Sequence, residues 1–146
     1  MVEAKEEEKP IVYLSMEAFE KLHKDMREQD NQIFPIQQAN IDFMFSRLPT
    51  AYENVRPLKE RVFHKAAYML RYFCYEAHAF NNGNKRMSLV YATVFLDFNG
   101  YDLKVRIEDN GREFMLGIAR GDITSITKIS LWLQENSQPV KVKNDP

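Results

Sequence analysis

The chain is poor in glycine and cysteine and carries no large excess of charge of either sign. Five glycines in 146 residues exclude a collagen-like or low-complexity protein. With a net charge of −1, the chain lacks the excess of positive charge that binding to a phosphate backbone requires. Nucleic acid is therefore not expected as the primary ligand. Cys74 is the one cysteine, which excludes a disulfide within the chain and favours a small buried side chain.

Long apolar runs are also absent. No stretch reaches the roughly 18 apolar residues of a membrane-spanning helix, so no association with a membrane is expected. The first ten residues include four Glu and two Lys, unlike a signal or transit peptide, and we therefore expect a cytoplasmic protein.

The apolar content is sufficient for one hydrophobic core. Hydrophobic residues make up 45% of the 17.2 kDa chain, with 10 Phe and 7 Tyr among them. This size suits one domain and is too small for two. We expect a flexible leader over residues 1–10, a helical domain over 11–136 and a flexible tail over 137–146.

Apolar residues recur every three or four positions through most of the domain, which predicts an all-α, single-domain bundle of about six helices. The helix after residue 86 is apolar nearly all round, as is typical of the centre of a bundle, and Asn99-Gly100 predicts its C-cap. Asp122 is the expected N-cap of the last helix. The expected helices cover residues 15–29, a short run between 35 and 49, 57–77, 87–98, 108–120 and 123–134.

Residues 78–86, His-Ala-Phe-Asn-Asn-Gly-Asn-Lys-Arg, join the two expected central helices. The start of a helix offers unpaired backbone N–H groups and a positive dipole end, so Gly83, Asn84 and Lys85 predict an anion-binding nest. Lys85 and Arg86 oppose the dipole unless an anion is bound. The alternative is a polar turn between helices with solvated cations. Both interpretations are open from these residues alone.

Two further residues of the loop have expected roles. Phe80 stands between polar positions and is the expected structural anchor that holds the loop against the core. His78 could then act as a general base on a hydroxyl group held near a bound phosphate.

The run 78–86 resembles the motif of the Fic/Doc family, which reads His, any residue or Pro, Phe, any residue, Asp or Glu, Gly or Ala, Asn, Lys or Gly, Arg. Similarity also extends to the flanking helices, over about 80 residues from Leu58 to Leu133. The opening Val-Tyr-Leu-Ser of residues 12–15 is similar to the Doc branch in particular.

The resemblance implies the Fic/Doc helical fold and a transferase that modifies a protein hydroxyl with a phosphoryl or AMP group from a nucleoside triphosphate, with ATP as the expected substrate. His78 would be the catalytic base. Gly83 and Asn84 would hold phosphate oxygens, and Lys85 and Arg86 would neutralise charge in the transition state. Lys85 stands where AMP-transferring members usually carry Gly, and Leu89 where they carry a second Arg. Both residues favour phosphoryl transfer.

Asn82 departs from the family, which carries an acid at this position to hold the metal that bridges the phosphates. An amide carbonyl can coordinate Mg²⁺ but brings no charge, so metal affinity should fall. Three interpretations stay open: activity with weaker metal binding, activity that uses another acid such as Glu76, or a degenerate domain that binds nucleotide or a protein partner without catalysis.

The resemblance also bears on partners. We find no self-inhibitory motif of the kind that many Fic enzymes carry. A Doc-like protein would instead be the toxin of a toxin-antitoxin pair, with a separate antitoxin as its partner. The sequence names neither the target protein nor the oligomeric state.

Overall fold

The computed structural model describes residues 10–29, 37–77, 84–106 and 109–140. Within these ranges the chain is mostly helical, which confirms the all-α prediction. The described residues hold six α-helices, one π-helical segment and two short strands: α1 (Met16–Gln29), α2 (Gln38–Arg47), α3 (Leu58–Arg71), η1 (Tyr72–Glu76), α4 (Asn84–Phe98), β1 (Tyr101–Leu103), α5 (Arg112–Ala119), α6 (Ile126–Glu135) and β2 (Ser137–Pro139).

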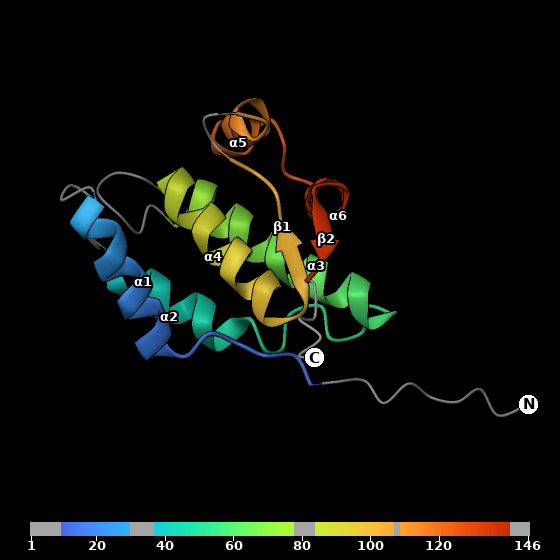
Figure 1. Cartoon of the computed structure of the whole chain (residues 1–146), viewed down its shortest axis with the longest axis horizontal. Coiled ribbons are helices and arrows are strands. Elements are labelled where there is room, and N and C mark those ends of the chain that lie inside the picture. The colour runs from blue at the N-terminus through green and yellow to red at the C-terminus, as the bar shows by residue number, and fades with distance from the viewer. Residues whose placement is uncertain (1–9, 30–36, 78–83, 107–108, 141–146) are drawn as a thin grey trace, which may run out of the picture.

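Helices α3 and α4 lie side by side at the centre, with α1 and α2 on one side and α5 and α6 on the other (Figure 1). Phe19 of α1 shows how the layers meet, because its buried ring contacts Tyr91 of α4 and Phe45 of α2 at centroid distances of 4.4 and 4.6 Å. None of the helices in the described ranges is long and apolar enough to cross a membrane.

The ends of several helices follow the predictions from sequence. The Ser15 hydroxyl accepts a hydrogen bond from the backbone N–H of Ala18 at 3.1 Å and so caps α1. Gly100 has a φ of 95°, the left-handed conformation expected of a residue after the C-cap. The Asn99 side chain also holds the N-terminal segment, since it accepts from the Val12 N–H at 2.8 Å and donates to the Val12 carbonyl at 2.9 Å.

Three local predictions were wrong. Helix α5 begins at Arg112 rather than near residue 108, because Asn110 forms a turn in which it accepts from the Arg106 N–H at 3.0 Å. Ser125 rather than Asp122 caps α6, with its hydroxyl accepting from the Lys128 N–H at 3.1 Å. Residues 137–139 of the expected tail form β2, which pairs antiparallel with β1. The overall domain boundaries stay predictions.

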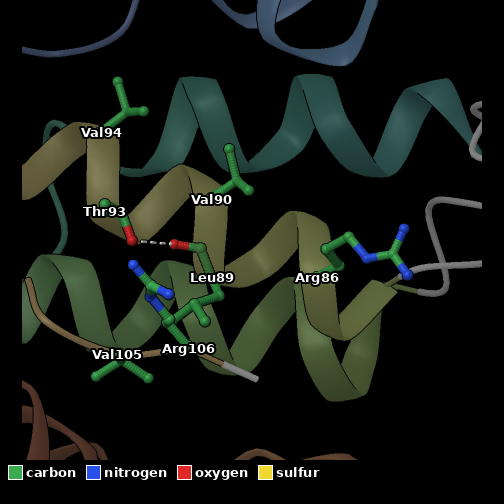
Figure 2. Close-up of a pocket in the computed structure, with 7 residues that line it drawn as sticks. All are labelled: Arg86, Leu89, Val90, Thr93, Val94, Val105 and Arg106. Carbon is green, nitrogen blue, oxygen red and sulfur yellow. Dashed lines mark hydrogen bonds between the residues drawn. The ribbon is translucent and has the colours of Figure 1, made fainter. Parts of the chain in front are cut away.

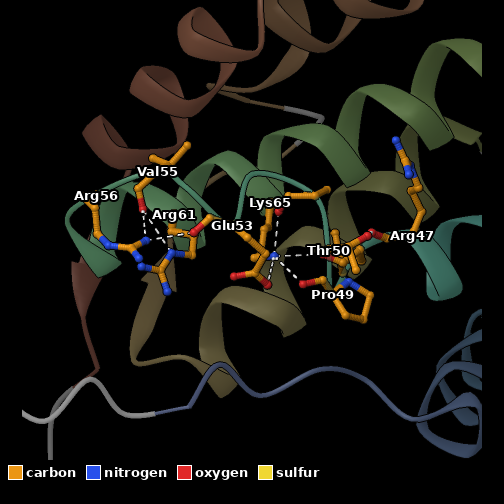
Figure 3. A network of polar contacts seen from close by, with 10 residues as sticks. Arg47, Pro49, Thr50, Glu53, Val55, Arg56, Arg61 and Lys65 are labelled. Carbon is orange, nitrogen blue, oxygen red and sulfur yellow. Dashed lines mark hydrogen bonds and ion pairs between the residues drawn. The ribbon is translucent and has the colours of Figure 1, made fainter.

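Lys65, at the centre of α3, anchors the loop between α2 and α3 (Figure 3). Its side chain is 0% exposed, and the ammonium donates to the carbonyls of Leu48, Pro49 and Ala51 at 2.9, 3.2 and 2.7 Å. It also donates to the Glu53 carboxylate at 3.1 Å. Burial lowers the pKa of Lys65, while the hydrogen bond and the charge of Glu53 raise it. We refer to this arrangement as the Lys65 cage.

Candidate functional site

The start of α4 brings three of the predicted site residues together. Asn84 is the first residue of the helix, and Lys85 and Arg86 follow in its first turn, which contains no acidic residue. The first turn of any α-helix presents unpaired N–H groups and the positive end of the dipole. Lys85 is half-buried and Arg86 is exposed, so two cationic side chains lie beside these N–H groups. This combination attracts an anion.

The first turn of α4 is held in place from within the helix. The Ser88 side chain is buried, and its hydroxyl donates to the Lys85 carbonyl at 2.7 Å. Met87 is also fully buried and fixes the same turn against the core. The cations therefore extend from a rigid backbone, which reduces the entropy lost when a ligand is bound.

A pocket of about 270 Å³ extends along α4 from Arg86 (Figure 2). Its floor is apolar, and Thr93 turns its hydroxyl toward the Leu89 carbonyl, to which it donates at 2.7 Å. Arg106, on the segment after β1, brings a second guanidinium group to the pocket. The remaining lining residues are Val90, Val94 and Val105.

Cys74 lies beneath the start of α4 and takes no part in this surface. Its thiol is buried and contacts the Met115 carbonyl at 3.7 Å. Burial raises the pKa of Cys74 to about 11, although the Ser88 hydroxyl and the charge of Lys85 both lower it. Such a thiol stays protonated at neutral pH and is not a nucleophile.

The remaining predicted site residues, His78, Phe80, Asn82 and Gly83, lie outside the described residues. Glu76, the alternative acid for a metal, is exposed and forms an ion pair with Arg71 at 3.2 Å. Across the described ranges, no group of three or more His, Cys, Asp or Glu side chains is arranged to hold a metal ion.

Sequence reasoning missed the pocket residues of the β1 to α5 segment, Val105 and Arg106. They lie some twenty positions from the motif, and no local pattern shows that this segment returns to α4. It also missed Asn40 of α2, which contacts the residue that precedes the motif. Contacts across helices of this kind leave no periodic signal in a sequence.

A comparison with protein-family models matches residues 10–96 to the Fic/DOC family. The matched range includes α1 to α3, the whole motif and most of α4, and so covers more than half of the chain. A comparison with curated proteins found no match. The family match agrees with the helical architecture and with the position of residues 84–86 at a helix start. The chain therefore belongs to the Fic/DOC family.

Proposed function

We propose that this protein is a transferase that moves a phosphoryl or AMP group from ATP to a hydroxyl group of another protein. The observation that carries the proposal is the start of α4, where Lys85 and Arg86 occupy a first turn without an acid. Cationic side chains in a first turn are disfavoured by the helix dipole by about 0.3 to 1 kcal/mol each, and a bound phosphate reverses that sign. Family membership supports a transferase of this type.

Five of the motif residues have a role in this reaction. His78 removes the proton from the attacking hydroxyl, whose oxygen then bonds to the phosphorus while the bond to the leaving phosphate breaks. Gly83 and Asn84 hold phosphate oxygens through their N–H groups. Lys85 and Arg86 stabilise the charge that builds up on the transferred group and on the leaving ADP or pyrophosphate.

Within the family we favour the Doc-like branch and phosphoryl transfer. Lys85 places a cation where AMP-transferring members usually carry Gly. Leu89 is buried on the floor of the pocket, so the position of their second Arg is apolar in this protein. On this branch the protein would be a cytoplasmic toxin controlled by a separate antitoxin, and that antitoxin is its expected partner.

Magnesium fits the site poorly. Asn82 offers a neutral amide oxygen in place of a carboxylate, and the carboxylate of Glu76, the alternative acid, is paired with Arg71. We therefore assign no catalytic step to a metal ion. Replacing Asn82 with Asp tests this point, because a restored carboxylate should raise transfer in the presence of Mg²⁺ at least tenfold.

The alternative function is a degenerate domain that binds nucleotide or a protein partner without catalysis. Asn82 is the observation that favours it. An Asn82→Asp variant that gains transfer activity while the wild type has none would support this alternative for the natural protein.

The deciding experiment incubates purified protein and a cell lysate with Mg²⁺ and with ATP labelled on its α or its γ phosphate. The proposal expects labelled protein bands with the wild type. The amount of label in these bands should fall at least 100-fold with His78→Ala and stay unchanged with the matched control His64→Gln. Label from the γ phosphate identifies phosphoryl transfer, and label from the α phosphate identifies AMP transfer. Absence of any His78-dependent label would contradict the enzyme proposal.

A further inference from the structure

Asn40 of α2 and the end of η1 are joined by two hydrogen bonds. The Asn40 side-chain amide donates to the backbone carbonyl of Ala77 at 2.7 Å. The Tyr72 hydroxyl donates to the backbone carbonyl of Asn40 at 2.8 Å. These groups are 37 and 32 residues apart in the chain. We refer to the two bonds as the Asn40 clamp.

The clamp acts where the helix changes its geometry. The Ala77 N–H donates to the Tyr72 carbonyl five residues earlier, at 2.8 Å, which is a π-helical bond. Such segments are rare and often lie at functional sites. The carbonyls of a last helical turn have no partner within the helix, and Ala77 is only 3% exposed, so little water can reach it. Asn40 supplies the missing donor, and both backbone polar groups of Ala77 are therefore bonded.

The fixed carbonyl of Ala77 belongs to the peptide unit that contains the nitrogen of His78. Because that peptide unit is planar, the hydrogen bond to its oxygen is a contact through which Asn40 can act on the residue that follows Ala77 in the chain. Within the last part of the motif, the Lys85 carbonyl accepts a hydrogen bond from the Ser88 hydroxyl at 2.7 Å. The described helix ends that precede and follow residues 78–83 are thus each held by a side-chain hydrogen bond.

We propose that Asn40 is a positioning residue for His78, acting through Ala77. Its amide holds the carbonyl of Ala77, the residue that directly precedes His78, and Tyr72 holds the backbone of Asn40 in the position that this bond requires. The catalytic consequence of the clamp rests on the proposed function. Its effect on the surroundings of His78 does not.

Imidazole NMR spectra test the clamp without any need for activity. The chain has three histidines, so the ring signals of His78 can be assigned by comparison with a His78→Ala sample. In an Asn40→Ala variant the His78 signals and its titration midpoint should shift, while the ring signals of His64 on α3 stay in place. Gln38→Ala is the matched control, because Gln38 lies on the same helix but bonds to the Asp42 carboxylate at the surface.

Two milder variants keep the test valid if Asn40→Ala does not fold. Tyr72→Phe removes only the hydroxyl that orients Asn40, and Asn40→Asp replaces the donor with a carboxylate that repels the Ala77 carbonyl. Each should shift the His78 signals in a protein that retains its cooperative thermal unfolding. Unchanged His78 signals and midpoint in all folded variants would overturn the positioning role.

Transfer kinetics extend the test if the wild type is active. A misplaced base should lower kcat about tenfold in Asn40→Ala and leave KM for ATP within about twofold, because the phosphate site at the start of α4 is intact. An equal kcat in Asn40→Ala and Gln38→Ala would overturn the catalytic consequence. A wild type without transfer whose His78 signals still respond to Asn40→Ala contradicts the proposed function and supports the clamp.

Discussion

Lys65 on α3 and the Lys85–Arg86 pair at the start of α4 are cations on neighbouring central helices, yet their surroundings are opposite. Lys65 is fully buried and donates to three carbonyls and one carboxylate. Lys85 and Arg86 lie at a helix start, half-buried and exposed, where the dipole disfavours them. Lys65 therefore stabilises the fold through its hydrogen bonds, whereas the position of Lys85 and Arg86 is the basis on which we propose that they bind a ligand.

Removal of the Lys65 ammonium should have the largest effect. In Lys65→Met the three carbonyls of the cage lose their donor, and we expect the free energy of unfolding to fall by about 3 to 5 kcal/mol. Urea unfolding followed by circular dichroism measures the loss. Lys85→Met is the matched control and should change the free energy of unfolding by less than about 0.5 kcal/mol. Similar losses of stability in both variants would contradict the difference that we draw between Lys65 and Lys85.

The reactivity of Cys74 tests whether burial outweighs the nearby charge of Lys85, which acts in the opposite direction on the pKa of the thiol. With a pKa of about 11, its thiolate should be about 100-fold scarcer at pH 8 than that of an unfolded cysteine with the ordinary value of 9.0. Alkylation by iodoacetamide should be slower by the same factor in the native protein and rise about tenfold per pH unit until the pH approaches 11. Equal rates in native and urea-unfolded protein at pH 8 would show that burial does not control this thiol.

Lys85 should contribute to the binding of phosphate. We expect Lys85→Ala to weaken the affinity for ATP about tenfold, the usual effect of losing one charge-assisted contact. Isothermal titration calorimetry measures it. Lys104→Ala is a suitable control, because Lys104 is an exposed lysine paired with Asp102 at 2.8 Å, away from α4's first turn. An equal loss in both variants would indicate general attraction of an anion rather than a site.

The smallest expected effect is a gain in stability. Lys85→Glu places an acid at the positive end of the α4 dipole and should raise the free energy of unfolding by about 0.5 kcal/mol at low salt. The gain should shrink in about 1 M NaCl because salt screens the dipole. Lys24→Glu, which makes the same charge change within α1, should show no such gain. A loss of stability in Lys85→Glu would mean that Lys85 stabilises the fold, as Lys65 does.

Much of the fold could be predicted from sequence because most of its helices are amphipathic or carry local end signals. Ser15 and Gly100 marked helix ends through groups that act within a few residues. The π-helical segment at Tyr72 and the strand β2 could not be predicted, because each depends on a partner far along the chain. For η1 that partner is Asn40, and for β2 it is β1.

The residues of the candidate site also fall into those that a local sequence signal predicts and those that only tertiary packing brings to the site. Lys85 and Arg86 stood out because two cations in a first turn contradict the local preference of a helix. Lys65 gave no such signal, since a lysine in an apolar helical pattern does not reveal whether carbonyls will surround it. Arg106 and Asn40 reach the site only through tertiary packing.

The most direct test of the account is an ATP titration of ¹⁵N-labelled protein followed through its backbone amide signals. We predict the largest saturable shifts at Asn84, Lys85 and Arg86, with little change in the loop held by the Lys65 cage. Saturable shifts that are largest elsewhere, or none at the start of α4, would contradict the claim that these cations serve a phosphate ligand.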